Sequence, residues 1–406
     1  MMLKLELLRI IKSRSTRYLS GAALLLSVLL AGMTIFMSYY YDSATGTSRH
    51  GLAAIAAERA EAALSEGEIT PEKIREAYAV NQELSRVYGQ VIPTEVWNSK
   101  MKPVYNTILN TRLVFFETNG MPKESTDISP EEAGNFYSQR KDYINKTIYY
   151  GHQNRQDVAD YALRLDERVE TPFVYQYGFG SSNTLAYLTV CVFILVVICS
   201  VISAPVFSSD YASGADDIQR CTRNGRRKLA HAKLLSSIII SSALFFLCTG
   251  VFLAITLPVF GLDGTSVQFN YSTGVLAFTN MSENGFLILV LISGFLTVLA
   301  MICLTLWLSS ILNSPVMVLA ISVGIALLPS IISVIGNTGN LVNWIRLCLP
   351  SGGTGLANMF TELGQGTFLT AGPLIVWSPH LMLAAALLEI PVFYLLARRC
   401  YIKHEL

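Results

Sequence analysis

The side chains that most often do chemistry in proteins are scattered along this sequence. It has five histidines, at His50, His152, His231, His380 and His404. Their separation argues against a metal cluster. The patterns GxxxxGK[ST], HExxH, CxxC and GxSxG, typical of phosphate-binding loops, metal or redox sites and nucleophilic serines, do not occur. We therefore expect a non-catalytic chain that binds no cofactor itself.

The most informative pattern of charges lies in the segment 208–233. Acids come first, at Asp210, Asp216 and Asp217. Bases follow, at Arg220, Arg223, Arg226, Arg227, Lys228 and Lys233. Negative charge early in a helix and positive charge late complement the backbone dipole. The pattern predicts a short amphipathic segment, and the alternative is a basic cluster that only fixes the chain at a membrane surface.

The composition of the chain divides it into two parts. Of its 406 residues, 52% are hydrophobic and 15% are charged, against about 25% charged in an ordinary soluble domain. Residues 42–182 hold 15 basic and 20 acidic side chains, whereas the remainder is strongly apolar. The formal net charge of +1 provides no general attraction for nucleic acid, which we do not expect as a partner. One part is expected in water and the other in a lipid bilayer.

Six apolar runs are long enough to cross the roughly 30 Å core of a bilayer as helices. They are residues 18–41, 183–207, 234–260, 286–312, 316–335 and 374–397. The first run is longer than the apolar core of a secretory signal and lacks a clear cleavage pattern, so we interpret it as a retained span. We predict an α-helical polytopic membrane protein with six transmembrane helices.

The distribution of basic residues predicts the orientation of these spans. Fourteen basic side chains fall in residues 1–17, in the segment 208–233 and in the tail 398–406, whereas the short loops of the opposite side hold only Arg346. Because basic residues accumulate in cytosolic segments, both termini are expected in the cytosol. Residues 1–17 have the apolar spacing of an amphipathic helix lying on the inner leaflet, the alternative being a disordered basic tail.

Residues 42–182 are then expected to form a mainly helical extracellular domain between the first two spans. Thr70-Pro71 has the residue types of a helix start, and Ser129 and Glu132 stand at the spacing of a capping box. None of the seven cysteines lies in this domain. The domain must therefore be stabilised by its own core rather than by disulfides.

The segment after the second span resembles the first cytosolic loop of permeases of the type-2 ABC exporter family. The resemblance lies in Phe207, an acid shortly after it, a glycine, and a basic run that ends at Lys233. It implies six spans and a coupling helix that docks on a separate ATP-binding subunit. The positions that would dock are Asp210, Tyr211, Gly214, Asp217 and Arg220. ATP and Mg would be bound by that partner, and a second permease copy or a paralogue would complete the transporter.

Two further features bear on the membrane part. Residues 340–373 are moderately apolar and broken by glycines, and their Leu349-Pro350 turn resembles the short re-entrant helices before the last span of that family; a plain outer loop is the alternative. Glu389 is the only formal charge well inside a span. We expect it either to face a polar cavity or the hydroxyl groups of a neighbouring span, or to be a protonated carboxyl at a bend beside Pro391.

These features together predict the permease subunit of an ATP-driven exporter of an amphipathic cargo, such as an antimicrobial peptide, a lipid-like compound or a drug. A sodium ion is the alternative cargo. The alternative function is that of a membrane receptor or mechanical transmitter, in which residues 42–182 sense a ligand. An intramembrane enzyme is disfavoured, because the spans contain no pair of charged residues.

Overall fold

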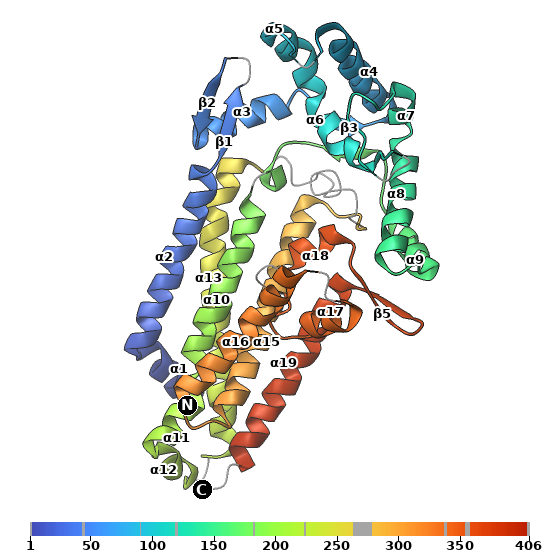
Figure 1. The fold of residues 1–406 in the computed structure, drawn as a ribbon. Helices are drawn as coiled ribbons and strands as arrows, with labels where there is room; N and C mark the ends of the chain where they lie inside the picture. Colours follow the sequence, from blue (N-terminus) through green and yellow to red (C-terminus); the bar gives the residue numbers. More distant parts are fainter. Residues whose placement is uncertain are drawn as a thin grey trace.

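Six long helices dominate the computed structural model of the chain, which describes residues 2–42, 45–89, 91–117, 121–181, 183–222, 225–262, 278–336, 339–353 and 358–403 (Figure 1). The helices that are long and apolar enough to cross a membrane are α2 (Arg14–Phe36), α10 with α11 (Thr184–Ser213), α13 (Arg227–Phe260), α15 (Glu283–Ser309), α16 (Pro315–Ile335) and α19 (Ser378–Lys403). The predicted helical polytopic class with six spans is confirmed.

The bundle is built around α15, which contacts α10, α13, α16 and α19. Gly294 of α15 lets α10 approach closely, because a Cβ atom there would lie 3.0 Å from Val192. Hydroxyl groups inside the bundle bond to their own helix: Thr297 Oγ1 donates to the Ser293 carbonyl at 2.9 Å, and Thr249 donates to the Phe245 carbonyl at 2.8 Å. Small residues and internally satisfied hydroxyls are the usual means of packing helices in lipid.

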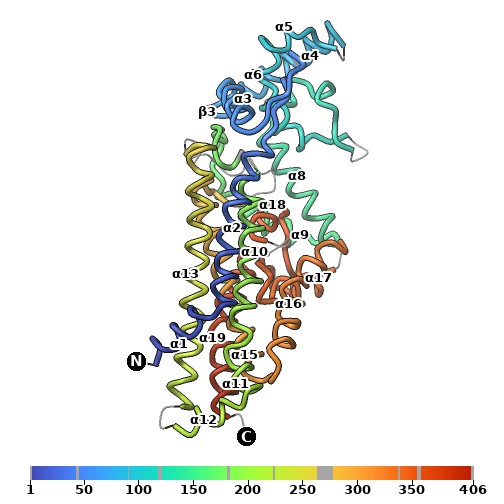
Figure 2. The backbone as a smooth tube through the Cα atoms, turned by 90° about the vertical axis from the view of Figure 1, so that its left-hand side faces the viewer, coloured from blue at the N-terminus to red at the C-terminus, as the bar shows by residue number. Residues whose placement is uncertain are grey.

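The first helix, α1 (Met2–Lys12), precedes the bundle and packs across α13 and α2 (Figure 2). It buries Ile10 against them and leaves Leu5 and Ile11 exposed. Both ends of the chain lie at the same end of the bundle, opposite the domain formed by residues 42–182 (Figure 1). We call that domain the inserted domain.

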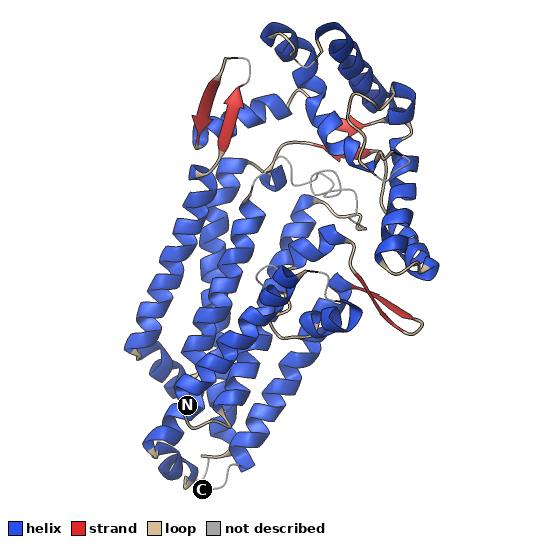
Figure 3. Cartoon of the chain, viewed as in Figure 1, coloured by secondary structure: helices blue, strands red, loops and turns tan. Residues whose placement is uncertain are grey.

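The inserted domain combines short helices with two antiparallel strand pairs (Figure 3). Its elements are β2 (Thr47–His50), α3 (Leu52–Ala62), β3 (Gly67–Ile69), α4 (Pro71–Tyr88), α5 (Thr94–Val96), a π-helical turn (Trp97–Met101), α6 (Lys102–Thr111), a 3-10 turn (Arg112–Val114), α7 (Pro130–Gly134), α8 (Phe136–Gly151), α9 (Gln156–Asp166), β4 (Phe173–Tyr175) and a 3-10 turn (Phe179–Ser181). Strand β1 (Tyr39–Asp42) pairs with β2, and β3 pairs with β4.

Two hydrophobic cores hold this domain. Ile74, Tyr78, Ile108 and Phe173 belong to a core of its own, whereas α8 and α9 contribute to the core of the bundle. The predicted helix start at Thr70 is observed, since its hydroxyl accepts from Lys73 N at 3.2 Å. Ser129 likewise accepts from Glu132 N at 3.1 Å. The Glu132 carboxylate, however, binds Lys123 at 2.7 Å, so the capping box is only half formed.

The connection between α16 and α19 holds two short helices and a hairpin. These are α17 (Gly339–Leu347), α18 (Met359–Gln365), β5 (Phe368–Ala371) and β6 (Leu374–Trp377). The span predicted at 374–397 therefore begins later, at Ser378. Leu374–Trp377 is a short apolar run rich in β-branched and aromatic residues, for which helix and strand cannot be separated by periodicity. The same ambiguity affects the predicted span 18–41, whose last residues, Tyr39–Tyr41, are in β1.

Other predicted boundaries also shift. The segment 208–233 is mostly helical, because α11 (Pro205–Ser213) continues the second span, α12 (Ala215–Arg220) follows, and α13 already begins at Arg227. The fourth span was placed at 286–312, but α15 ends at Ser309, where the Ser310 hydroxyl donates to the Trp307 carbonyl at 2.7 Å. The predicted tail 398–406 is helical to Lys403, and its last three residues lie outside the described part of the chain.

Candidate functional site: the α11–α12 corner

A sharp turn between α11 and α12 forms a corner at the end of the bundle that carries both termini (Figure 1). Gly214 makes the turn with φ +69°, a left-handed conformation that glycine adopts without strain. Pro205 is the first residue of α11, and its missing N–H interrupts the hydrogen-bond ladder between α10 and α11. We call residues 205–220 the α11–α12 corner.

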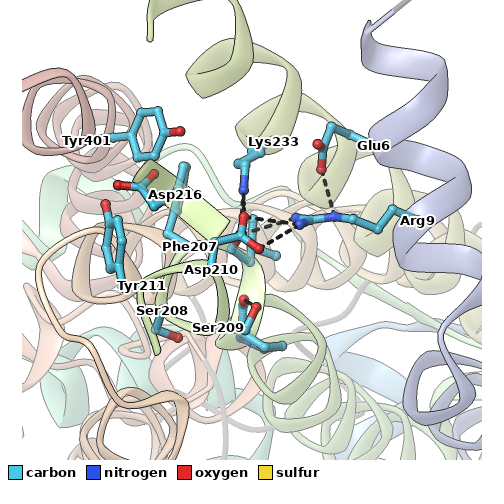
Figure 4. A network of polar contacts seen from close by, with 12 residues as sticks. Glu6, Arg9, Phe207, Ser208, Ser209, Asp210, Tyr211, Asp216, Lys233 and Tyr401 are labelled. Carbon is cyan, nitrogen blue, oxygen red and sulfur yellow. Dashed lines mark hydrogen bonds and ion pairs between the residues drawn. The ribbon is translucent and has the colours of Figure 1, made fainter. Parts of the chain in front are cut away.

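Asp210 is the centre of a buried charge network at this corner (Figure 4). Its two carboxylate oxygens each accept from Arg9 Nη1 at 3.1 Å, and Lys233 forms an ion pair with it from α13. Glu6 binds the other side of Arg9 at 2.9 Å. Two acids thus face two bases, which balances the charge of the network.

Lys233 is fully buried, with 0% of its side chain exposed. Its ammonium also donates to the Val206 carbonyl at 3.2 Å and lies 5.5 Å from the centre of the Phe207 ring. A buried cation is tolerated only when it is paired and hydrogen-bonded. The network therefore ties α1, α11 and α13 together through Asp210.

A second buried pair holds α12 against the end of the last helix. Arg220 lies 3.1 Å from Asp216, and its guanidinium is 4.9 Å from the centre of the Tyr401 ring in α19. Arg220 also donates to the Tyr401 carbonyl, and the Tyr401 hydroxyl donates to the Gly225 carbonyl at 3.3 Å. This pair therefore couples α12 to α19.

Hydrogen bonds to α15 and the residue after it complete the attachment. The backbone N–H groups of Phe207 and Ser208 donate to Ser309 Oγ at 3.1 and 3.0 Å, and that hydroxyl donates to the Ala204 carbonyl at 2.7 Å. The Tyr211 hydroxyl donates to the Ser310 carbonyl at 3.3 Å. The corner is consequently held by α1, α13, α15 and α19 at once.

The five residues expected to dock a partner differ in their exposure to solvent. Asp210 and Arg220 are buried, Tyr211 is half-buried, and Gly214 and Asp217 are exposed. The docking role of all five stays a prediction, but the buried Asp210 and Arg220 have little surface for a partner to contact directly. Beside Asp217 lies Ile218, 76% exposed, which the sequence reasoning missed. A lone isoleucine among charged residues was its only signal.

Comparison with known families decides the identity of the chain. A family model described as ABC-2 family transporter protein matches residues 1–343, which include the whole corner. The chain belongs to this family. It is therefore a transmembrane subunit of an ABC transporter and a multi-pass membrane protein, and the family implies an ABC ATP-binding partner. Comparison with curated proteins finds no match.

Glu389, the charged residue expected inside a span, lies on α19 and is half-buried. One of its carboxylate oxygens is buried and has no hydrogen-bond partner among the described residues. This oxygen therefore does not make the predicted contact with hydroxyl groups of a neighbouring span. A hydroxyl contact through the other oxygen, the polar cavity and the protonated carboxyl beside Pro391 all stay as predictions. Wild-type transport by Glu389→Gln would exclude a role for the charge in this ABC-2 permease.

Proposed function

We propose that this chain is the permease of an ATP-driven exporter, and that the α11–α12 corner receives the mechanical work of a separate ATP-binding subunit. The observation that carries the proposal is the pairing of Asp210 with both Arg9 and Lys233. It belongs to the same corner as the exposed Gly214 and Asp217. A force applied to the exposed side is passed to several helices, because buried pairs leave the corner no independent movement.

In this proposal both termini are cytosolic and the inserted domain is extracellular. ATP and Mg are bound by the partner, while this chain contributes no reacting group. Two permeases, identical or paralogous, form one transporter. Closure of the ATP-binding subunits shifts the spans between inward and outward access, which requires different affinities of the nucleotide for the two states. The cargo is amphipathic, such as a peptide, a lipid-like compound or a drug.

Co-purification tests the docking surface directly. The double variant Asp217→Arg/Ile218→Asp changes only exposed side chains of the corner and should abolish capture of the ATP-binding subunit. The matched control is Asp127→Arg, an exposed acid of the inserted domain, which should leave capture unchanged. Undiminished capture by the double variant would contradict the docking assignment.

A second candidate function is supported by the separate core of the inserted domain. Ile74, Tyr78 and Phe173 belong to a core distinct from that of the bundle, which would allow this part of the domain to hold its own ligand site. In this case the chain would be a receptor that relays binding to a cytosolic partner. Ligand binding would then stimulate ATP hydrolysis by the partner without any transport of that ligand, which a flux assay on reconstituted vesicles distinguishes.

A further inference from the structure

A cavity of about 600 Å³ lies at the junction of the inserted domain with the α16–α19 connection. Its walls come from the end of α8 and the residues after it, from the start of α17, and from the segment between α18 and β5. A second cavity of about 240 Å³ adjoins it and shares Asn343, Gln365 and Thr367 as lining residues. Volumes of several hundred Å³ are typical of ligand sites.

The walls of the cavity are fixed by hydrogen bonds between segments far apart in the sequence. His152 Nε2 lies 3.0 Å from the Phe368 carbonyl, and Arg155 donates to the Gly372 carbonyl at 3.2 Å. The side-chain amide of Asn340 binds both backbone groups of Thr370. It donates to the Thr370 carbonyl at 2.5 Å and accepts from the Thr370 N–H at 3.1 Å. The backbone of β5 is thus already occupied at Phe368 and Thr370, so the strand cannot pair there with an added peptide strand.

Neutral polar side chains face the cavity with unused hydrogen-bonding capacity. Gln153, Gln365, Thr147 and Thr367 line it, and none of their side chains is hydrogen-bonded to another described residue. An amide offers two donors and two acceptor positions, and a hydroxyl offers both roles. At the rim, Tyr150 is 71% exposed and presents a broad apolar ring.

The charges around the cavity are neutralised within the protein. Arg155, the charged lining residue of the larger cavity, is paired with Asp157. In the smaller cavity Arg346 and Glu362 form a buried pair at 2.6 Å. Recognition of phosphate or carboxylate groups relies on available cationic donors. The lining therefore favours an uncharged polar ligand over an anion.

The backbone at the rim is held in an unusual conformation. Gln153 and Asn154 follow α8 with φ values of 56° and 62°, in the left-handed region that non-glycine residues seldom adopt. Such outliers concentrate at ligand-binding sites, because the surrounding structure must compensate for the strain. Here the strained residue Gln153 is a lining residue of the cavity.

From these observations we propose that the cavity binds an uncharged, hydroxyl-rich ring, that is, a sugar unit. Adjacent hydroxyls would each donate to and accept from the amides of Gln153 and Gln365, and the C–H face of the ring would rest on Tyr150. The sugar is either a glycolipid head group or a free oligosaccharide. The proposal concerns this chain alone and does not depend on an ATP-binding partner.

Hydrogen–deuterium exchange on the full chain in lipid nanodiscs tests the proposal, after purification in a detergent that carries no sugar. The probes are maltotriose, cellotriose and chitotriose in solution, a monoglucosyl diacylglycerol in the nanodisc, and glycerol phosphate as the anionic comparison. At least one sugar probe should slow exchange over residues 147–155 and 339–347 several-fold. Protection by the glycolipid alone identifies a head group, and protection by a trisaccharide identifies a free sugar. Protection by none of the sugars, or more strongly by glycerol phosphate, would overturn the proposal.

Two variants separate binding from folding. Gln365→Leu removes one amide, and Gln153→Gly removes the other while placing a glycine where φ is positive. Each should weaken binding of the protecting sugar at least tenfold, and Gln153→Gly should unfold at the same or a higher temperature than the wild type. The matched control is Gln156→Ala, whose exposed amide binds Asp160 at 2.8 Å outside the cavity. Wild-type affinity in both variants would refute the site.

Discussion

Two buried charge sites in this protein have similar chemistry but different placements. In the inserted domain, Arg140 and Asp166 lie 2.6 Å apart with 2% of each side chain exposed, and the Phe173 ring is 5.3 Å from the guanidinium. They join α8 and α9, which are neighbours in sequence. At the corner, Asp210 instead joins α1 and α13 to α11, through residues 201 and 23 positions away.

The difference shows that a buried ion pair does not mark a functional site by itself. Both sites incur the cost of removing charges from water, and both recover it by pairing. The Arg140–Asp166 pair is enclosed within one part of the fold and can only stabilise it. The Asp210 network belongs to the corner that contains the exposed Gly214 turn, and it connects α1 and α13 to α11, the helices that move together in the proposed function. Each of the following substitutions tests this distinction.

The largest effect is expected for Asp166→Leu, which removes the carboxylate that pairs with the buried Arg140 guanidinium. Breaking one side of a buried pair costs about 3–5 kcal/mol. The thermal unfolding temperature of the full chain should fall markedly, while the ATP-binding partner is still captured at low temperature. The control is the double variant Arg140→Leu/Asp166→Leu, which should recover much of the loss. An unchanged unfolding temperature in the single variant would contradict the structural role.

A smaller loss of stability but a larger functional loss is expected for Asp210→Asn. The amide still accepts hydrogen bonds but no longer balances Lys233, so we expect a cost at the lower end of the range of about 3–5 kcal/mol for a broken buried pair. Cargo-dependent ATP hydrolysis by the assembled transporter should be lost at temperatures where the variant is folded. Asp217→Asn is the matched control for stability, because this carboxylate is exposed and its replacement should change stability by less than about 0.5 kcal/mol. Normal coupling in Asp210→Asn would show that the network only stabilises the fold.

A moderate effect is expected for Arg9→Gln, which removes the attachment of α1 to the corner. Because 38% of the Arg9 side chain is exposed, its loss should cost only about 1 kcal/mol. Protease cleavage within residues 2–12 should accelerate, since α1 then keeps only its apolar contacts. Lys12→Gln, on the same helix and without an ion pair among the described residues, serves as the control. Equal cleavage rates in both variants would argue against the attachment.

The smallest effect concerns Glu58 of the inserted domain, whose pKa is raised mainly by burial. A carboxyl with a raised pKa in the folded state stabilises the fold most below its ordinary pKa, and this contribution is lost as the pH rises through the raised value. Glu58→Gln mimics the protonated form. It should therefore raise the unfolding temperature at pH 7. The gain in the free energy of unfolding should be less than about 1 kcal/mol, because solvent screens this partly exposed group. The gain should vanish near pH 4 (about the ordinary pKa of glutamate), and a gain that persists there would exclude this cause.

The sequence was sufficient to predict those features that depend on local residue types. Run length and apolarity predicted six spans, which the structure confirms, and Thr70 begins a helix as its side chain requires. Leu374–Trp377 was assigned to a span because an apolar run of four residues fits a strand as well as a helix. The residue that distinguishes a strand from a helix here is Gly372 in the preceding turn, which has φ +59° in the structure.

The long-range contacts of the corner could not be predicted in the same way. The segment 208–233 was recognised from its charges, but nothing local indicates that Asp210 is bound by Arg9 or that Arg220 contacts Tyr401. Such partners are brought together only by the packing of the helices. Exposure, which decides whether Asp210 or Asp217 can face a partner, follows from the same packing.

The salt bridge between Arg9 and Asp210 also has a consequence for biogenesis. Arg9 leaves the ribosome 201 residues before its partner, which at roughly 5–20 residues per second is a delay of about 10–40 s. During this interval the initial helix has neither Asp210 nor α13 to hold it. Synthesis of the third span is therefore the step after which α1 can form its contacts with Asp210 and α13.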